Sequence, residues 1–205
     1  MSAPDRLPPP GRMVAFTDAA VAIALTLLVL PLVELVPEAA RAGEPGAGAI
    51  IAGNLPAIGS FLLGFAVIAR LWVSHHQLFG FAVRLTPSLV TLNLVWVLTI
   101  TALPFFVELV SSYGPSDVVL RSFVGNLLVS SVLLTTMTVV MRRTGEADGD
   151  GSGPSEEFVT SSIAATVNFL VAFLLTLIVP WLSYYSMLVL FLDPLTTRLV
   201  TRLRR

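Results

Sequence analysis

Residues 12–32 read RMVAFTDAAVAIALTLLVLPL, a stretch that is apolar apart from Arg12, Thr17, Asp18 and Thr26. As an α-helix with a rise of 1.5 Å per residue it would be about 30 Å long, which is the thickness of a bilayer's hydrocarbon core. An acid at the centre of such a helix costs about 2.5–3.5 kcal/mol if it faces lipid. We therefore expect a transmembrane helix whose Asp18 faces other helices of a bundle.

Ile23, Leu27 and Leu30 form an aliphatic stripe, because their i, i+4, i+7 spacing places them on one face of a helix. Asp18 lies five residues before Ile23, which is about 140° around the helix. Asp18 should therefore face the helices of its own subunit, and the stripe should face away from them. Ordinary helix packing explains most stripes of this kind, so the spacing alone leaves the role of this one open.

The composition is that of an integral membrane protein. Hydrophobic residues make up 55% of the 205 residues and charged residues only 12%, whereas a soluble domain has about 25% charged residues. The chain has no cysteine, which excludes disulfides and cysteine-ligated metals. A cleaved signal peptide is disfavoured, because the first apolar stretch is too long and contains an acid.

Six apolar stretches are long enough to cross a membrane, so we predict an all-α protein with six transmembrane helices in one domain, residues 1–205. The expected spans are 12–32, 54–74, 87–109, 117–141, 158–179 and 182–199, with a loop or short interfacial helix over 34–53. A Pro-rich lead-in (1–11), a flexible linker (142–157) and a basic tail (200–205) complete the chain. Asn54, Thr86 and Ser155 stand at span starts as candidate N-caps.

The arginines predict the orientation, since every basic residue of the chain is an arginine. If both termini are cytoplasmic, only Arg41 and Arg121 lie on the outer side of the membrane. The other ten then lie on the cytoplasmic side: Arg6, Arg12, Arg70, Arg84, Arg142, Arg143, Arg198, Arg202, Arg204 and Arg205. The positive-inside rule favours this arrangement, so we expect a multi-pass plasma-membrane protein with cytoplasmic termini.

Asp18, His75, His76 and Asn93 are polar side chains that could meet inside the membrane. The geometry predicts Asp18 near His75 or His76, with Asn93 as a further partner. Mutual hydrogen bonding is the simplest interpretation, because buried polar groups need partners. Proton relay or pH sensing is the alternative, because histidine titrates near neutrality. A metal site is disfavoured, since adjacent histidines on a helix point about 100° apart.

Arg12, Phe16, Thr17 and Asp18 form an Arg-x-x-x-Phe-Thr-Asp motif at the start of the first span. It resembles the Arg-x-x-x-Phe-Ser-Asp signature that opens the first helix of the endolysosomal potassium channel family, transmembrane protein 175. Thr17 replaces the usual serine and keeps its hydroxyl.

Two further motifs extend this resemblance over about the first half of the chain. They are Trp72-x-x-His75-His76-x-x-Phe79, similar to the family's Trp–His pattern, and Leu92-Asn93-Leu94 with Leu103-Pro104-Phe105, similar to its Asn-Leu and Leu-Pro-Phe elements. The later spans match the family only in number and length.

The resemblance implies a potassium-permeable cation channel, a homotetramer whose first helix lines the pore. In such a channel Ile23, Leu27 and Leu30 would form an apolar constriction, which can gate by dewetting. The family's supporting network would comprise Arg12, Phe16, Thr17, Asp18, Trp72, His75, His76 and Asn93. The Thr-Val-Gly-Tyr-Gly filter of ordinary potassium channels is absent from the sequence.

A second hypothesis is a proton-coupled carrier that uses Asp18 and His75. An intramembrane enzyme ranks lowest, because the sequence has no clear nucleophile–base pair or metal motif. We expect no cofactor, no bound metal and no nucleic-acid partner, since the basic residues are dispersed. The expected partners are other copies of the chain, membrane lipids, potassium and other monovalent cations.

Overall fold

The computed structural model describes residues 7–43, 46–114, 116–148 and 153–178. Within these ranges the chain is entirely helical apart from short connections: α1 (Pro10–Leu27), α2 (Leu30–Ala42), α3 (Ala47–Gly53), α4 (Leu55–Phe79), α5 (Pro87–Tyr113), α6 (Asp117–Asp148) and α7 (Glu156–Ile178). Five stretches of the described chain are long and apolar enough to cross a membrane: Pro10–Ala42, Leu55–Phe79, Pro87–Tyr113, Asp117–Gly145 and Glu156–Ile178. The predicted all-α membrane class is thus confirmed, while the span 182–199 and the tail 200–205 lie outside the described residues.

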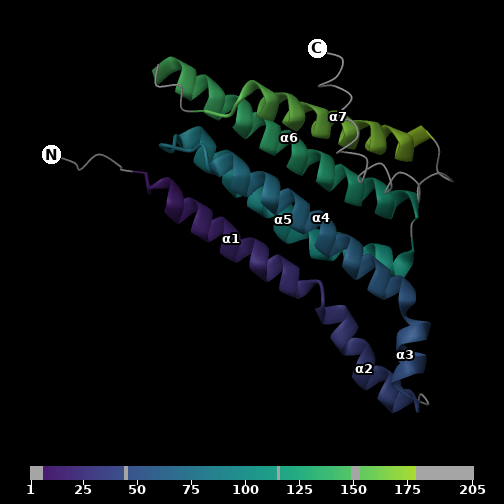
Figure 1. Cartoon of the computed structure of the whole chain (residues 1–205). Helices are drawn as coiled ribbons and strands as arrows, with labels where there is room; N and C mark the ends of the chain where they lie inside the picture. Colours follow the sequence, from purple (N-terminus) through teal and green to yellow (C-terminus); the bar gives the residue numbers. More distant parts are fainter. Residues whose placement is uncertain (1–6, 44–45, 115, 149–152, 179–205) are drawn as a thin grey trace.

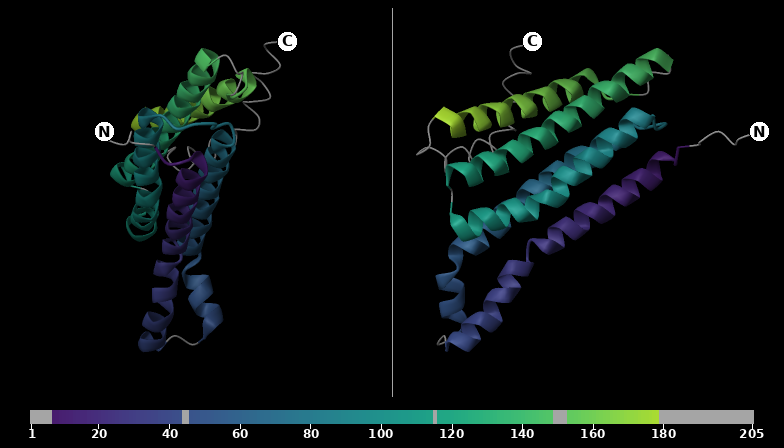
Figure 2. Two further views of the ribbon diagram at one scale, coloured as in Figure 1. Left: turned by 90° about the vertical axis from the view of Figure 1, so that its left-hand side faces the viewer. Right: turned by 180° about the vertical axis from the view of Figure 1, so that it is seen from behind.

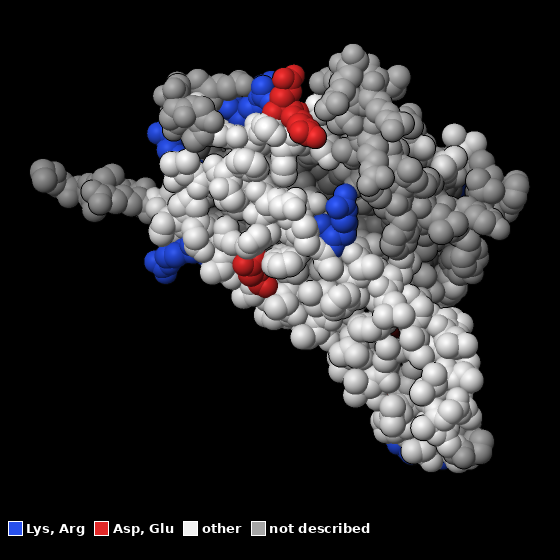
Figure 3. All heavy atoms as spheres, viewed as in Figure 1, with Lys and Arg blue, Asp and Glu red and all other residues white. Residues whose placement is uncertain are grey.

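The long helices pack lengthwise as one bundle. α1 lies along α4 and α5, and α6 lies between α5 and α7. α6 and α7 form an antiparallel pair (Figures 1 and 2). α2 and α3 contact each other. Both extend past the end of the bundle at which α1 ends. Charged side chains are sparse on the face drawn in Figure 3, as expected for a surface that meets lipid.

The first span is broken rather than one straight helix. α1 ends at Leu27, and the Val29 N–H bonds only three residues back, to the Thr26 carbonyl at 3.3 Å. Pro31 explains the break, because proline has no N–H and its ring clashes with the carbonyl four residues earlier. The continuous helix predicted over 12–32 is therefore wrong at its C-terminal end. Of the loop or short helix expected over 34–53, the helical alternative is observed, because α2 and α3 cover most of that stretch.

Two of the three predicted N-caps are confirmed. Thr86 Oγ1 accepts from the Leu89 N–H at 3.3 Å, and Ser155 Oγ accepts from the Phe158 N–H at 3.2 Å. Asn54 does precede α4, but its side chain donates to the Ile50 carbonyl at 2.8 Å instead of capping the helix.

Several helices are longer than predicted. α4 continues to Phe79, α5 continues to Tyr113, and α6 runs to Asp148, into the stretch expected to be a flexible linker. With this extension the Trp–His motif, Trp72 to Phe79, forms the last two turns of α4, at the end of the helix as expected.

The core lies where α1, α4, α5 and α6 meet, and its largest fully buried side chains are Trp96, Phe123 and Ile68. Gly64 lets α4 approach α5 closely: a Cβ there would lie 2.7 Å from Val107 Cγ2 and 3.2 Å from Leu28 Cδ2. Small residues at such crossings allow membrane helices to gain van der Waals contact.

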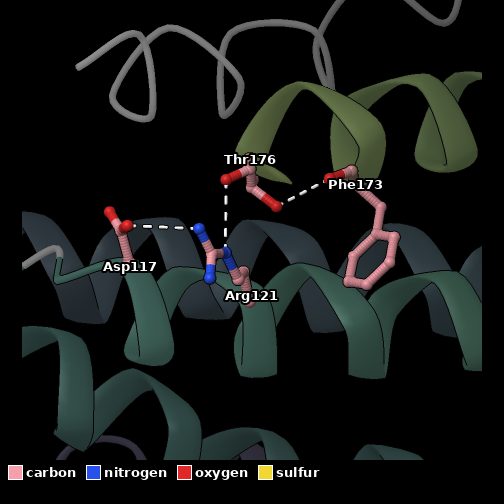
Figure 4. Close-up of polar contacts among 4 residues, drawn as sticks. All are labelled: Asp117, Arg121, Phe173 and Thr176. Carbon is pink, nitrogen blue, oxygen red and sulfur yellow. Dashed lines mark hydrogen bonds and ion pairs between the residues drawn. The ribbon is translucent and has the colours of Figure 1, made fainter. Parts of the chain in front are cut away.

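Arg121 ties the start of α6 to the end of α7 (Figure 4). Its Nε donates to the Thr176 carbonyl at 3.3 Å and its Nη2 to Asp117 Oδ2 at 3.1 Å, while Thr176 Oγ1 donates to the Phe173 carbonyl at 2.6 Å. Carbonyls in the last turn of a helix have no intrahelical partner and carry the negative end of its dipole. A cation at this position satisfies one of them, so Arg121 has a structural role.

Candidate functional site: the first helix and its polar support

Asp18 is held by α4. Its Oδ1 accepts a hydrogen bond of 2.8 Å from Nε1 of Trp72, a side chain that is itself half-buried. The prediction that Asp18 faces its own bundle is therefore correct in direction, but its hydrogen-bond partner is the indole of Trp72 and neither histidine. An indole N–H can only donate, so a carboxylate oxygen is a suitable partner for it.

Asn93 of α5 links α4 to α1 through both ends of its amide. Its Oδ1 lies 2.6 Å from Nε2 of His75, and its Nδ2 donates to Thr17 Oγ1 at 2.9 Å and approaches Met13 Sδ at 3.1 Å. All four side chains are buried. Since the amide nitrogen donates to Thr17, its oxygen must accept from His75, so the histidine proton resides on Nε2.

The ring of His75 is clamped between two aromatic rings. Phe79 and Trp96 both stack on it with centroids 4.4 Å away, at interplanar angles of 23° and 17°. Its Nδ1 has no hydrogen-bond partner among the described residues. No hydrogen bond there joins His75 to Asp18 either, so the two groups that the carrier hypothesis couples are not directly connected.

His76, Phe16 and Arg12 lie outside this hydrogen-bonded network. His76 is exposed, with its ring 5.4 Å from that of Trp72; Phe16 is exposed on α1, and Arg12 is exposed in its first turn. Among the described residues, no three His, Asp or Glu side chains are grouped so that they could hold a metal ion.

Met13 and Trp96 belong to the site although the sequence motifs did not mark them. Helical spacing could have found both: Met13 precedes Thr17 by four residues, and Trp96 follows Asn93 by three. Positions three or four apart share a helix face. A side chain that contacts Thr17 can therefore also reach Met13, and one that contacts Asn93 can also reach Trp96.

The aliphatic stripe faces away from the bundle of its own subunit. Ile23, Leu27 and Leu30 are 59%, 46% and 49% exposed in the single chain. The opposite face of the same span is buried, as Val21, Ala24 and Leu28 show. Leu30 lies beyond the break at the start of α2, so the stripe continues across two helices.

The family model described as "Endosomal/lysosomal potassium channel TMEM175" matches residues 12–104, the part of the chain that contains the first two motifs and all of the third except Phe105. A potassium channel of Streptomyces collinus is 34% identical over 107 residues, which are 52% of this chain and 50% of that protein. A potassium channel of Chamaesiphon minutus is 28% identical over 181 residues, 84% of this chain and 87% of that one.

The fold is also similar to a solved structure. The crystal structure of a lysosomal potassium-selective channel TMEM175 homolog from Chamaesiphon minutus has a TM-score of 0.67 at 25% identity, covering 92% of this chain and 97% of that one. The human endosomal/lysosomal proton channel TMEM175 is 29% identical over 104 residues, which are 50% of this chain and 20% of the human protein. The match thus spans half of the Streptomyces relative and a fifth of the human one.

Proposed function

We propose that the chain is a potassium-permeable cation channel whose first helix lines an apolar constriction, in keeping with its similarity to the TMEM175 potassium channel family. The exposure of Ile23 and Leu27 is the observation that supports this most directly. These side chains stand on a membrane-spanning helix whose opposite face is bonded to its own bundle. A ring of branched apolar side chains around an axis would gate by dewetting and would require a hydrated ion to shed water.

Several copies of α1 are needed to surround an ion path. The proposal therefore includes a homotetramer in which each chain, residues 1–205, contributes one six-helix domain and Ile23, Leu27 and Leu30 face the axis. Cyclic symmetry would bring equivalent residues of each copy together around it. Membrane lipids surround the assembly, and potassium and other monovalent cations pass through it.

The polar residues of the signature motifs have a supporting role in this proposal. The bonds from Trp72 to Asp18 and from Asn93 to Thr17 fix the rotation of α1 about its axis. That rotation decides which side chains point away from the subunit. The remaining motif residues assigned to this support are Arg12, Phe16, His75 and His76.

The channel is favoured over the proton-coupled carrier on two grounds. The relatives named above are described as channels. In addition, Asp18 bonds to Trp72 and His75 bonds to Asn93, so no direct hydrogen bond leads from the acid to the histidine within the described chain.

Flux from reconstituted liposomes tests the function. Purified protein in vesicles with an outward potassium gradient should release potassium at a rate that grows with the gradient without coupling to a proton gradient. Protein-free vesicles are the control. Strict dependence on a proton gradient would support the carrier, and no flux would contradict both hypotheses. A parallel arm with a pH-sensitive dye separates potassium from proton permeation, which matters because the human relative is named a proton channel.

The proposed setting is the plasma membrane with both termini in the cytoplasm, as the arginine distribution favours. Reporter fusions after Arg205 and within 145–154 should both report cytoplasm. A signal from the opposite side at either point would overturn the six-span topology.

A further inference from the structure

The face of the first span that carries the aliphatic stripe does not end at Leu30. Glu34 follows Leu30 by four residues and Ile23 by eleven, and eleven steps of 100° differ from three full turns by only about 20°. Glu34 is exposed, as Leu30 is. On a helix that keeps its register, Glu34 is therefore the next residue of the stripe.

The break after Leu27 preserves this register, as the inward face of the span shows. Its buried or half-buried side chains follow one another at steps of three and four residues across the break: Val21, Ala24, Leu28, Leu32, Leu35 and Ala39. This spacing is that of one continuous helix face. Helical bonding also resumes at once, because the Val33 N–H donates to the Val29 carbonyl at 3.1 Å. The outward face of α1 therefore continues into α2, and Glu34 lies on it.

Glu34 lies near the end of the hydrocarbon core that is opposite to Arg12. The span Pro10–Ala42 has 33 residues, about 50 Å at 1.5 Å per residue, whereas the core is about 30 Å thick. With Arg12 at one boundary, the other boundary falls near Leu32, and α2 continues past the end of the bundle (Figure 1). Within the described chain, the Glu34 carboxylate takes part in no hydrogen bond or ion pair. Its charge is therefore available to a passing ion.

The apolar constriction leaves one property of a cation channel unexplained. Branched alkyl side chains resist the entry of any hydrated ion, whatever its sign. We propose that Glu34 supplies the missing discrimination, by facing the mouth of the pore and making it selective for cations over anions. Glu34 can do so only if the chain forms the channel proposed above, because only an assembly around an axis turns the outward face of α2 into a pore lining.

The physical reason is the field of several carboxylates around one axis. Each copy contributes one Glu34 side chain, and rings of acidic side chains attract cations at a pore mouth. Glu38 and Arg41, one and two turns further out on α2, are of opposite sign and largely cancel. Glu34 lies about 16 Å from Ile23 along the helix at 1.5 Å per residue. It therefore raises the local concentration of potassium before the ion reaches the constriction.

A charge exchange on the assembled channel tests this directly, because the chain has no cysteine of its own. In planar bilayers under a KCl gradient, Glu34→Cys should show a smaller reversal potential than the parent protein, which means a weaker preference for potassium over chloride. A thiol reagent that carries a sulfonate should restore the preference, and one that carries a trimethylammonium group should weaken it further. Val33→Cys is the matched control, since Val33 is 56% exposed but lies about 100° around the helix. Equal responses at both positions, or none at position 34, would overturn the proposal.

Ionic strength separates an electrostatic role of Glu34 from a structural one. The Debye length is about 30 Å at 0.01 M salt and about 3 Å at 1 M. Glu34→Gln should therefore lower the potassium current that enters from the Glu34 side by up to about tenfold at low salt, and by little at high salt. Equal losses at both salt concentrations would show a structural role and contradict the proposal. The parent protein is measured first: a parent without potassium current contradicts the channel itself, whereas a conducting parent whose Glu34→Gln variant keeps its reversal potential contradicts only the role of Glu34.

Discussion

The indole Nε1–H of Trp72 donates a 2.8 Å hydrogen bond to Asp18 Oδ1 and thereby joins α4 to α1 across 54 positions of sequence. This contact sets how α1 is rotated against its bundle. Asp18 and Ile23 lie about 140° apart on the helix, so holding the acid inward keeps the aliphatic stripe outward.

Removal of this bond should destabilise the assembly. Asp18→Ala leaves the Trp72 donor unpaired, at a cost of about 1–3 kcal/mol, and we expect a lower melting temperature and loss of stable oligomer in size-exclusion chromatography. Asp18→Asn is the control, because it keeps an acceptor oxygen and should lose less. If Asp18→Ala assembles normally and changes only ion preference, Asp18 lines the pore and its assignment to the support is wrong.

The hydroxyl of Thr17 should matter more than its methyl group. Thr17 is fully buried and its Oγ1 accepts from Asn93 Nδ2. Thr17→Val keeps the shape but removes the acceptor, so we expect a loss of about 1–3 kcal/mol in unfolding free energy. Thr17→Ser keeps the hydroxyl and should remain closer to the parent protein. Equal losses in chemical denaturation would show that the hydrogen bond contributes nothing.

Replacement of Ile23 by Asn tests the constriction. If Ile23 faces the pore axis, water occupies the gap and the dewetting barrier falls, so potassium flux should rise and discrimination against sodium should weaken with little loss of stability. Val21→Asn is the matched control, since Val21 is only 2% exposed and faces the core. It should unfold more easily, because it buries an unpaired amide. An Ile23→Asn protein that is unstable and silent would refute the pore assignment.

Gly64 should tolerate no larger residue. Gly64→Ala would bring a Cβ within 2.7 Å of Val107 Cγ2, and overpacking of this kind costs about 1–3 kcal/mol. Gly59→Ala in the same helix meets no atom within 4 Å, so it should be neutral or slightly stabilising. Thermal unfolding of both variants checks the contrast. Addition of Val107→Ala should recover part of the Gly64→Ala loss, and a failure to do so would place the clash elsewhere.

The sequence alone predicted the features that depend on local composition and helical period. The membrane class follows from hydropathy, and the caps at Thr86 and Ser155 follow from the hydrogen-bonding chemistry of a helix start. The opposite facing of Asp18 and Ile23 follows from the 100° step of an α-helix. The break after Leu27 could also have been predicted from the sequence, because Pro31 causes it.

Only the tertiary structure decided which groups meet. A helical wheel predicts a face but no partner, because the partner depends on how far neighbouring helices are shifted and rotated against each other. That shift brings Trp72 rather than a histidine to Asp18, and places His75 between Phe79 and Trp96. It also brings the Arg121 side chain to a carbonyl of α7 that is 55 positions away. These contacts form between helices, where packing and hydrogen bonding act together, and one helix read alone carries no information about them.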